Sequence, residues 1–132
     1  MTEISPTSTP AAALLATGLV TAIDHVGIAV PDLDAALTWY AENLGLVSTH
    51  EEVNEEQGVR EAMLSVPGSP EGATQIQLLA PLNENSTIAK FLDRSGPGLQ
   101  QLAYRVSDLD AVSAALRAHG VRLLYDAPRR GT

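Results

Sequence analysis

Residues 23–37, with the sequence IDHVGIAVPDLDAAL, decide the fold, because a related stretch, LQQLAYRVSDLDA, returns at residues 99–111 with an offset of 76 positions. Setting His25 on Gln101 brings identical residues together at five positions. The matched pairs are Val30 with Val106, Asp32 with Asp108, Leu33 with Leu109, Asp34 with Asp110 and Ala35 with Ala111. Two copies are too few for a solenoid, so we predict one pseudo-symmetric domain built from two strand–turn–helix units.

The composition is that of a single globular domain. The chain has 132 residues, of which 45% are hydrophobic and 18% are charged. This length and this hydrophobic content are enough to form a buried hydrophobic core. The absence of cysteine excludes disulfides and thiolate metal sites. A net charge of −8 disfavours nucleic acid and anionic membranes as partners, because both bind clustered positive charge.

Residues 1–20 lack the positively charged start of a secretory signal, and no hydrophobic run in the sequence is long enough to span a bilayer. We therefore predict a disordered tail over 1–20 and a soluble, cytoplasmic protein.

Alternation and helical spacing predict the elements of the first unit. Residues 21–30 alternate with the period of a strand, and Asp32 is expected to cap a helix that ends at Gly45. The apolar stripe of this helix is Leu33, Leu37, Tyr40 and Leu44. Three further strands are expected over 46–52, 59–66 and 74–80, with a turn at 54–58 and a loop at 67–72.

The second unit follows a linker over residues 81–97, in which a short helix over 86–94 is capped by Asn85 or Ser86. We expect a strand over 99–106, a helix over 108–119 with Ser107 as its cap, and a further strand from 121 to 125. The apolar stripe of this second helix is Leu109, Val112 and Leu116. The second unit has room for one strand after its helix where the first has three, so we expect the chain to be truncated.

A candidate site emerges from the faces of the predicted strands. If Val26, Ile28 and Val30 face the first helix, then His25 faces the other way. The same alternation places Glu61 in the strand over 59–66 and Gln77 in the strand over 74–80 on the face that carries His25. One surface of the sheet should therefore carry an imidazole, a carboxylate and an amide.

This set of residues has a functional and a structural interpretation. Imidazole with carboxylate and amide oxygens suits a divalent metal of intermediate hardness, at a site that keeps open positions for a substrate. The structural interpretation is the commoner one for a lone histidine in a strand, and no short metal-binding motif such as His-Glu-x-x-His accompanies His25. Glu61 shares its face with Met63, so desolvation would raise its pKa toward that of a useful base, unless it is a solvated charge on an open sheet.

Five stretches resemble a known family. The segment DHVGIAV at 24–30 resembles the paired βαβββ modules of the vicinal oxygen chelate superfamily, which includes glyoxalases and dioxygenases. More specifically, the chain resembles the methylmalonyl-CoA epimerase family from residue 21 to 132. The segments that carry this closer likeness are NEEQGVRE at 54–61, QIQLLAPLN at 75–83, STIAK at 86–90 and GVRLLYD at 120–126. The resemblance implies an α+β domain over 21–132 with a curved mixed sheet. Module one would span 21–80, the linker 81–97 and a partial module two 98–132.

The resemblance also implies a metal site and a base. A divalent ion, most often Co²⁺ with Mn²⁺, Ni²⁺ or Zn²⁺ as alternatives, would be bound by His25, Gln77 and Gln101, and Glu61 would be catalytic. Gln101 stands where the family has a histidine, and the family's last ligand, a glutamate on the final strand, is not reached. These three neutral ligands predict weak metal binding by this chain alone, with a C-terminal carboxylate completing the site in the parent protein.

The activity that the resemblance implies is that of an isomerase. It would interconvert the 2R and 2S forms of methylmalonyl-CoA, in propionate metabolism, by removing and returning a proton at carbon 2 through a metal-stabilised enolate. The implied partners are an acyl-CoA substrate and a second copy of the chain in a homodimer. Arg60, Arg105 and Arg129 are candidates for CoA contacts by charge alone. The alternatives are a metal-free module that binds small molecules, a glyoxalase-type isomerase and a dioxygenase.

Overall fold

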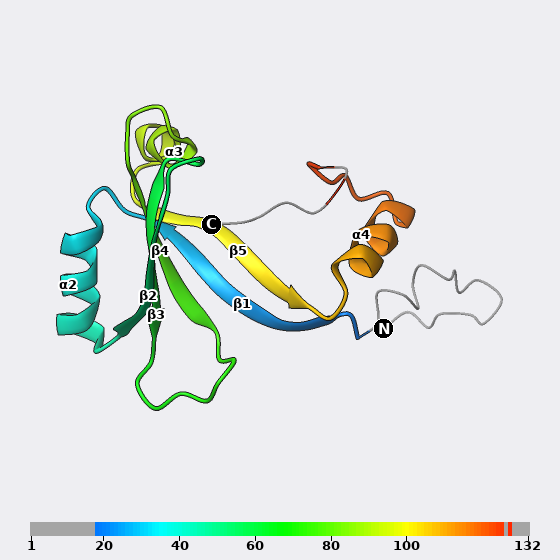
Figure 1. Cartoon of the computed structure of the whole chain (residues 1–132), viewed down its shortest axis with the longest axis horizontal. Coiled ribbons are helices and arrows are strands. Elements are labelled where there is room, and N and C mark those ends of the chain that lie inside the picture. The colour runs from blue at the N-terminus through cyan, green and yellow to red at the C-terminus, as the bar shows by residue number, and fades with distance from the viewer. Residues whose placement is uncertain (1–17, 126, 128–132) are drawn as a thin grey trace. The chain divides into compact units, whose positions relative to one another are not determined.

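The computed structural model describes residues 18–125 and 127, so most of the tail predicted over 1–20 lies outside the described residues. Five strands and three helices follow one another along the described chain (Figure 1). In chain order they are β1 (Val20–Ala29), α2 (Leu33–Leu44), β2 (Val47–Asn54), β3 (Val59–Ser65), β4 (Gln75–Pro81), α3 (Thr87–Ser95), β5 (Gly98–Val106) and α4 (Leu109–Ala118). The predicted order of strands and helices up to residue 118 is confirmed, with boundaries shifted by one or two residues.

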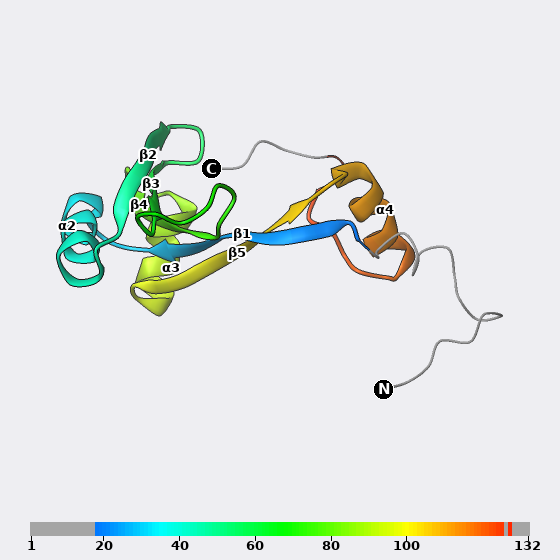
Figure 2. The same cartoon turned by 90° about the horizontal axis from the view of Figure 1, so that it is seen from below.

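The strands form one mixed, curved sheet in the order β2-β3-β4-β1-β5. β1 runs parallel to β4, whereas β3 is antiparallel to both β2 and β4. The arrows of β1 and β5 point in opposite directions where the two strands lie side by side (Figure 2). The sequence β1-α2-β2-β3-β4 is therefore a βαβββ module, in which α2 leads from β1 to the distant strand β2 and the chain returns through β3 to β4, which pairs with β1. The predicted α+β fold class is confirmed.

Helix α2 covers one face of the sheet. Asp32 caps it by accepting a hydrogen bond from the backbone N–H of Ala35, and Gly45 ends it in the left-handed conformation at φ 69°, as predicted. Leu33 is buried against a cluster of strand residues that face the helix. That cluster comprises Val30, Ala62, Leu64, Leu78 and Ala80, with Leu37 and Tyr40 packed beside it. Leu44 is exposed, so the predicted apolar stripe ends one turn earlier than expected.

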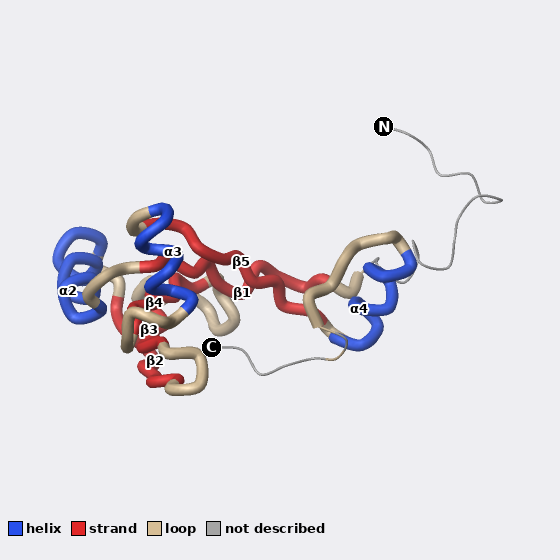
Figure 3. Tube along the Cα trace, turned by 90° about the horizontal axis from the view of Figure 1, so that it is seen from above, coloured by secondary structure: helices blue, strands red, loops and turns tan. Residues whose placement is uncertain are grey.

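Helix α3 packs on the opposite face, beside the start of β3 and the end of β4 (Figures 1 and 3). Ser86, one of the two predicted caps, accepts a hydrogen bond from the backbone N–H of Ala89. The helix buries Ile88 against strand residues that face the same way as His25, namely Ala29, Val59 and Leu79, and the partly buried Phe91 and Leu92 pack beside them. The segment expected only as a linker with a short helix therefore supplies an apolar cover to the face that carries the candidate site.

The chain divides into two compact units, and the candidate site lies in the unit formed by residues 23–103. The other unit contains residues 1–22 and 104–131, and its described part includes α4. The cap of α4 is Asp108, which accepts from the N–H of Ala111, so the prediction of Ser107 is wrong. Ser107 instead donates its backbone N–H to the Leu19 carbonyl. Leu109, predicted to belong to the apolar stripe of α4, is also exposed.

Residues 121–125 form no strand, in contrast to the prediction. A strand requires a neighbouring strand to receive its backbone hydrogen bonds, and no ladder partner faces this segment among the described residues. The carbonyl of Tyr125 accepts a hydrogen bond from the Arg117 side chain instead, and Leu124 is exposed. Among residues 18–125 and 127, no helix combines the length and apolarity that crossing a bilayer requires.

Candidate active site

Four neighbouring strands bring the candidate residues to one face of the sheet. His25 lies on β1, Glu61 on β3, Gln77 on β4 and Gln101 on β5. Gln77 is the register partner of Gly27 on one side and of Met63 on the other, so all three face the same way. His25 lies two positions from Gly27, and Glu61 lies two positions from Met63. Because every second residue of a strand faces the same side, His25 and Glu61 share the face of Gln77. This is the face on which α3 packs, and the predicted parity of all three strands is confirmed in the register.

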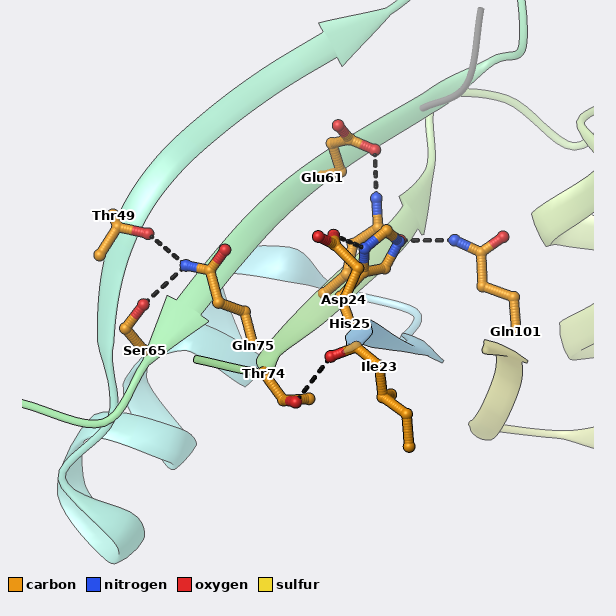
Figure 4. Close-up of polar contacts among 10 residues, drawn as sticks. Ile23, Asp24, His25, Thr49, Glu61, Ser65, Thr74, Gln75 and Gln101 are labelled. Carbon is orange, nitrogen blue, oxygen red and sulfur yellow. Dashed lines mark hydrogen bonds and ion pairs between the residues drawn. The ribbon is translucent and has the colours of Figure 1, made fainter. Parts of the chain in front are cut away.

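A chain of hydrogen bonds links three of these side chains. Gln101 donates from Nε2 to Oε1 of Gln77 over 2.5 Å, and Gln77 donates from Nε2 to Oε2 of Glu61 over 2.8 Å. Gln77 is 1% exposed and Glu61 is 3% exposed. In the close-up, the side chains of Glu61 and Gln101 approach the region of His25 from two sides (Figure 4). The structure thus connects the carboxylate and both amides of the predicted set through direct contacts.

The Glu61 carboxyl has a raised pKa. Burial is the main cause, because a buried carboxylate loses its hydration, and the nearby Glu52 carboxyl raises the pKa further. The N–H of Gln77 and the charge of His50 act in the opposite direction. A buried carboxyl whose pKa is moved upward in this way is suited to accept a proton from a weak carbon acid, because its basicity is closer to that of the reacting group.

His25 has a fixed ring orientation. Its Nδ1 lies 2.7 Å from Oδ2 of Asp24, and both side chains are partly buried. In the ring tautomer that donates from Nδ1 to this carboxylate, Nε2 is the nitrogen that could bind a cation. Histidines that bind metals are commonly oriented by this kind of carboxylate contact. Asp24 is a residue that the sequence interpretation missed, although its place next to His25 was visible.

A second polar cluster holds the strands beside His25. Gln75, the register partner of His25, donates from Nε2 to Ser65 Oγ over 2.6 Å and to Thr49 Oγ1 over 3.0 Å (Figure 4). Thr74 donates to the carbonyl of Ile23 over 2.7 Å. These contacts join β1, β2, β3 and β4 around the imidazole, so the spacing of the strands at the site is fixed by side chains as well as by the backbone ladder.

Two neighbours of the site differ from what the sequence indicates. Glu52 on β2 is the register partner of Glu61 and lies on the site face, although it was not predicted as a functional residue. Arg60, a candidate for CoA by charge, donates to both carboxylate oxygens of Asp34 in α2, at 2.9 and 3.2 Å. It therefore projects to the face opposite Glu61. Arg129, another candidate, lies outside the described residues.

Replacing Glu52 should change the pH dependence of any reaction that uses Glu61 as a base. In Glu52→Gln the negative charge and the hydrogen bond that raise the pKa of Glu61 are lost, so Glu61 ionises at lower pH. The acid limb of the pH profile of kcat/KM should then move to lower pH. Glu51→Gln is the matched control, because Glu51 faces Arg60 on the other side of β2. An unmoved limb in Glu52→Gln, or an equal shift in both variants, contradicts this expectation.

The donor set of the site fits a divalent cation only in part. His25 offers an imidazole nitrogen, and Gln77 and Gln101 offer amide oxygens, which divalent ions of intermediate hardness accept. Both amides are engaged with each other, and Gln101 presents its nitrogen to Gln77, so its amide must turn over before its oxygen could bind a cation. Among the described residues there is no group of three or more histidine, aspartate or glutamate side chains arranged to hold a metal.

Comparison with known proteins identifies the family. The model of the Glyoxalase/Bleomycin resistance protein/Dioxygenase superfamily matches residues 24–132. The chain belongs to this superfamily. Within the superfamily, the chain is 36% identical over 103 residues to the ethylmalonyl-CoA/methylmalonyl-CoA epimerase of Cereibacter sphaeroides, covering 77% of this chain and 73% of that protein.

Solved structures from the superfamily extend this likeness to three dimensions. The methylmalonyl-CoA epimerase of Mycobacterium tuberculosis superposes with a TM-score of 0.81 at 63% identity, covering 93% of this chain and 80% of that one. A methylmalonyl-CoA epimerase in complex with methylmalonyl-CoA and NH₄⁺ superposes with a TM-score of 0.78 at 48% identity, covering 86% and 79%. The resemblance to the methylmalonyl-CoA epimerases that the sequence motifs predict is confirmed.

Proposed function

We propose that the chain is a methylmalonyl-CoA epimerase, which interconverts the 2R and 2S forms of its substrate by removing and returning a proton at carbon 2. One observation of the structure carries this proposal. Glu61 is a buried carboxyl with a raised pKa, held by Gln77 on the face of the sheet that also carries His25. The likeness to epimerases at up to 63% identity supports the choice of substrate.

Glu61 is proposed as the base that takes the proton from carbon 2. The carbon is acidified by its thioester, and a carboxyl with a raised pKa is better matched to such an acid than a solvated one. The N–H of Gln77 donates to the carboxylate of Glu61 and holds it in one orientation. The apolar cluster under α3 keeps water away from this side of the site.

We propose that His25, Gln77 and Gln101 hold a divalent cation, with Co²⁺ as the first choice and Mn²⁺, Ni²⁺ or Zn²⁺ as alternatives. When bound, such an ion supplies Lewis-acid stabilisation of the negative charge that develops on the thioester oxygen. Asp24 supports this role of His25 in the ring tautomer that donates from Nδ1 to its carboxylate and leaves Nε2 free of hydrogen. The three ligands are neutral, so the charge of the ion is not compensated by them and binding should be weak.

We also propose an acyl-CoA partner and a homodimer. The acyl-CoA partner is supported by solved relatives in complex with methylmalonyl-CoA and with 2-nitronate-propionyl-CoA. The homodimer is supported by β5, which is the last strand of the described sheet and carries the exposed apolar side chains of Leu102 and Tyr104. Light scattering after gel filtration would measure the mass of the assembly, and a monomer at all concentrations would contradict the dimer.

Solvent exchange tests the proposed reaction. The chain, stripped of metal by a chelator, is incubated with methylmalonyl-CoA in D₂O with and without added Co²⁺, and deuterium at carbon 2 is followed by mass spectrometry. We expect deuterium to enter the substrate, faster with Co²⁺ than without. A Co²⁺-loaded protein that binds methylmalonyl-CoA but incorporates no deuterium would contradict an epimerase and favour a binding module of the same superfamily.

A further inference from the structure

The unit that holds the candidate site is strongly acidic. Residues 23–103 include twelve aspartate and glutamate residues but only three lysine and arginine residues, which are Arg60, Lys90 and Arg94. An acyl-CoA carries negative charge on its 3′-phosphate and its pyrophosphate, and methylmalonyl-CoA adds a carboxylate. Most of this surface repels such a ligand. Within the unit, these three side chains are the ones with a permanent positive charge that can attract its phosphates.

Arg60 is already engaged on the other face of the sheet. Its guanidinium donates to both carboxylate oxygens of Asp34 in α2 and lies 3.6 Å from the Glu51 carboxylate. Lys90 and Arg94 differ from Arg60 in both respects. They lie on α3, which packs on the site face, and both are exposed. Neither forms an ion pair with another residue in the part of the chain that the structure describes.

The two charges lie together on one side of α3. Residues four positions apart on a helix are neighbours, with about 5–6 Å between their Cβ atoms. The Arg94 guanidinium also lies over the ring of Phe91, 5.7 Å from its centre. This contact restrains Arg94 while its N–H groups stay able to donate to phosphate oxygens. Two cations at this spacing suit one phosphate group or two adjacent ones.

This pair of charges is unfavourable for the helix itself. Like charges four residues apart repel each other and destabilise a helix. The helix dipole accounts for Arg94, which lies in the last turn, but Lys90 lies one turn earlier. An anion bound between the two side chains would remove their repulsion. Ligand binding therefore explains the pair better than the stability of α3 does.

The position of α3 fits the length of an acyl-CoA. The helix packs on Val59 and Leu79, which lie two positions from Glu61 and Gln77 on β3 and β4 (Figure 3). Two strand residues span about 7 Å, and a helix with its side chains is about 10–12 Å across. Cations on the outer side of α3 are thus too far from Glu61 to contact the acyl group. They lie within reach of phosphates at the far end of an extended pantetheine arm.

We propose that Lys90 and Arg94 bind the phosphate groups of the acyl-CoA and hold its nucleotide end at α3. The choice of acyl-CoA rests on the proposed function, whereas affinity for a phosphorylated nucleotide depends only on these two side chains. In this role Lys90 and Arg94 lower the KM of the substrate and take no part in the proton transfer at carbon 2.

The kinetic test compares methylmalonyl-CoA with methylmalonyl-pantetheine, which keeps the thioester and lacks the phosphates. Lys90→Ala combined with Arg94→Ala should raise the KM of methylmalonyl-CoA about tenfold with kcat unchanged, as expected for two exposed contacts between charges. The KM of methylmalonyl-pantetheine should stay at its wild-type value. Alanine is the best helix former, so the melting temperature should not fall.

Two further variants separate a local contact from a change in net charge. Lys90→Arg combined with Arg94→Lys keeps both positive charges and should keep the KM of methylmalonyl-CoA near the wild-type value. Arg122→Ala removes one positive charge from the other unit and should also leave this KM unchanged. The proposal is overturned if the double alanine variant keeps the wild-type KM, if it raises the KM of both thioesters equally, or if Arg122→Ala raises it as much.

Binding of adenosine 3′,5′-bisphosphate, the nucleotide end of CoA, tests the proposal without turnover. Calorimetric titration of the wild type should show binding that weakens as the NaCl concentration rises, because salt screens exposed charges. The double alanine variant should bind this nucleotide about tenfold more weakly. A wild type that does not bind it, or a double variant that binds it equally well, overturns the proposal. Binding that depends on Lys90 and Arg94 in a protein without epimerase activity would contradict the proposed function alone.

Discussion

Glu61→Gln should abolish turnover of methylmalonyl-CoA while leaving metal binding nearly intact. The amide keeps the shape of the carboxyl, and its oxygen still accepts the hydrogen bond from Nε2 of Gln77. It cannot take up a proton, and a general base contributes about 10²- to 10⁴-fold to a rate. Deuterium incorporation at carbon 2 measures the loss, and calorimetric titration with Co²⁺ measures the metal affinity. A variant that retains the wild-type exchange rate would show that Glu61 is not the base.

The same substitution should make the protein more stable at neutral pH. The folded-state pKa of Glu61 is raised above that of the unfolded chain, so the folded state binds the proton more tightly. Stability is therefore lost as the pH rises from the unfolded value, about 4.3, through the folded one. Glu61→Gln escapes this loss, so its melting temperature should exceed that of wild type at pH 7, and the difference should shrink toward pH 4. A lower melting temperature at pH 7 would contradict a pKa raised by burial.

Leu33→Ala should be the most destabilising single truncation in α2. Leu33 is 2% exposed and packs against the strand residues beneath the helix, including Leu64 and Leu78. Removing a buried leucine side chain leaves a cavity and costs about 2–5 kcal/mol, a large part of the typical stability of a domain. The free energy of unfolding in urea measures the effect.

Leu44→Ala is the control within the same helix. Leu44 ends α2 and is 58% exposed, so its truncation should change the free energy of unfolding by no more than about 0.5 kcal/mol. Equal losses in the two variants would mean that α2 does not dock through its N-terminal half. The comparison separates the loss of packing from any general effect of alanine on the helix.

Most of the first module could be predicted from local patterns, because alternation and capping are encoded within a few residues. Asp32 and Gly45 mark the ends of α2, and the parity of β1, β3 and β4 places His25, Glu61 and Gln77 on one face. The internal repeat predicts the N-cap of α4 correctly, whereas the local capping pattern, which indicated Ser107, does not. It pairs Asp32 with Asp108, and each accepts from the N–H of the alanine three residues on.

The features that escaped prediction depend on contacts between distant segments. Glu52 reaches the site because β2 pairs with β3 in a register that shifts between Ser48 and His50, and such an irregularity breaks the alternation on which a sequence argument relies. Gln101 reaches Gln77 across Gly27, and this contact depends on the strand order, which the sequence pattern does not contain. The strand predicted over 121–125 is absent for a similar reason, because a segment with strand propensity forms no strand without a neighbouring strand to pair with.

The ion pair between Arg60 and Asp34 has a consequence for the other side of the sheet. Arg60 and Glu61 are consecutive residues of β3, so any roll of this strand about its long axis swings both side chains at once. The two hydrogen bonds from the Arg60 guanidinium to the Asp34 carboxylate, in the first turn of α2, oppose such a rotation. Helix α2, which contributes no residue to the candidate site, thus helps to orient the Glu61 carboxylate. The peptide bond between Arg60 and Glu61 links the helix-covered face of the sheet to the site face.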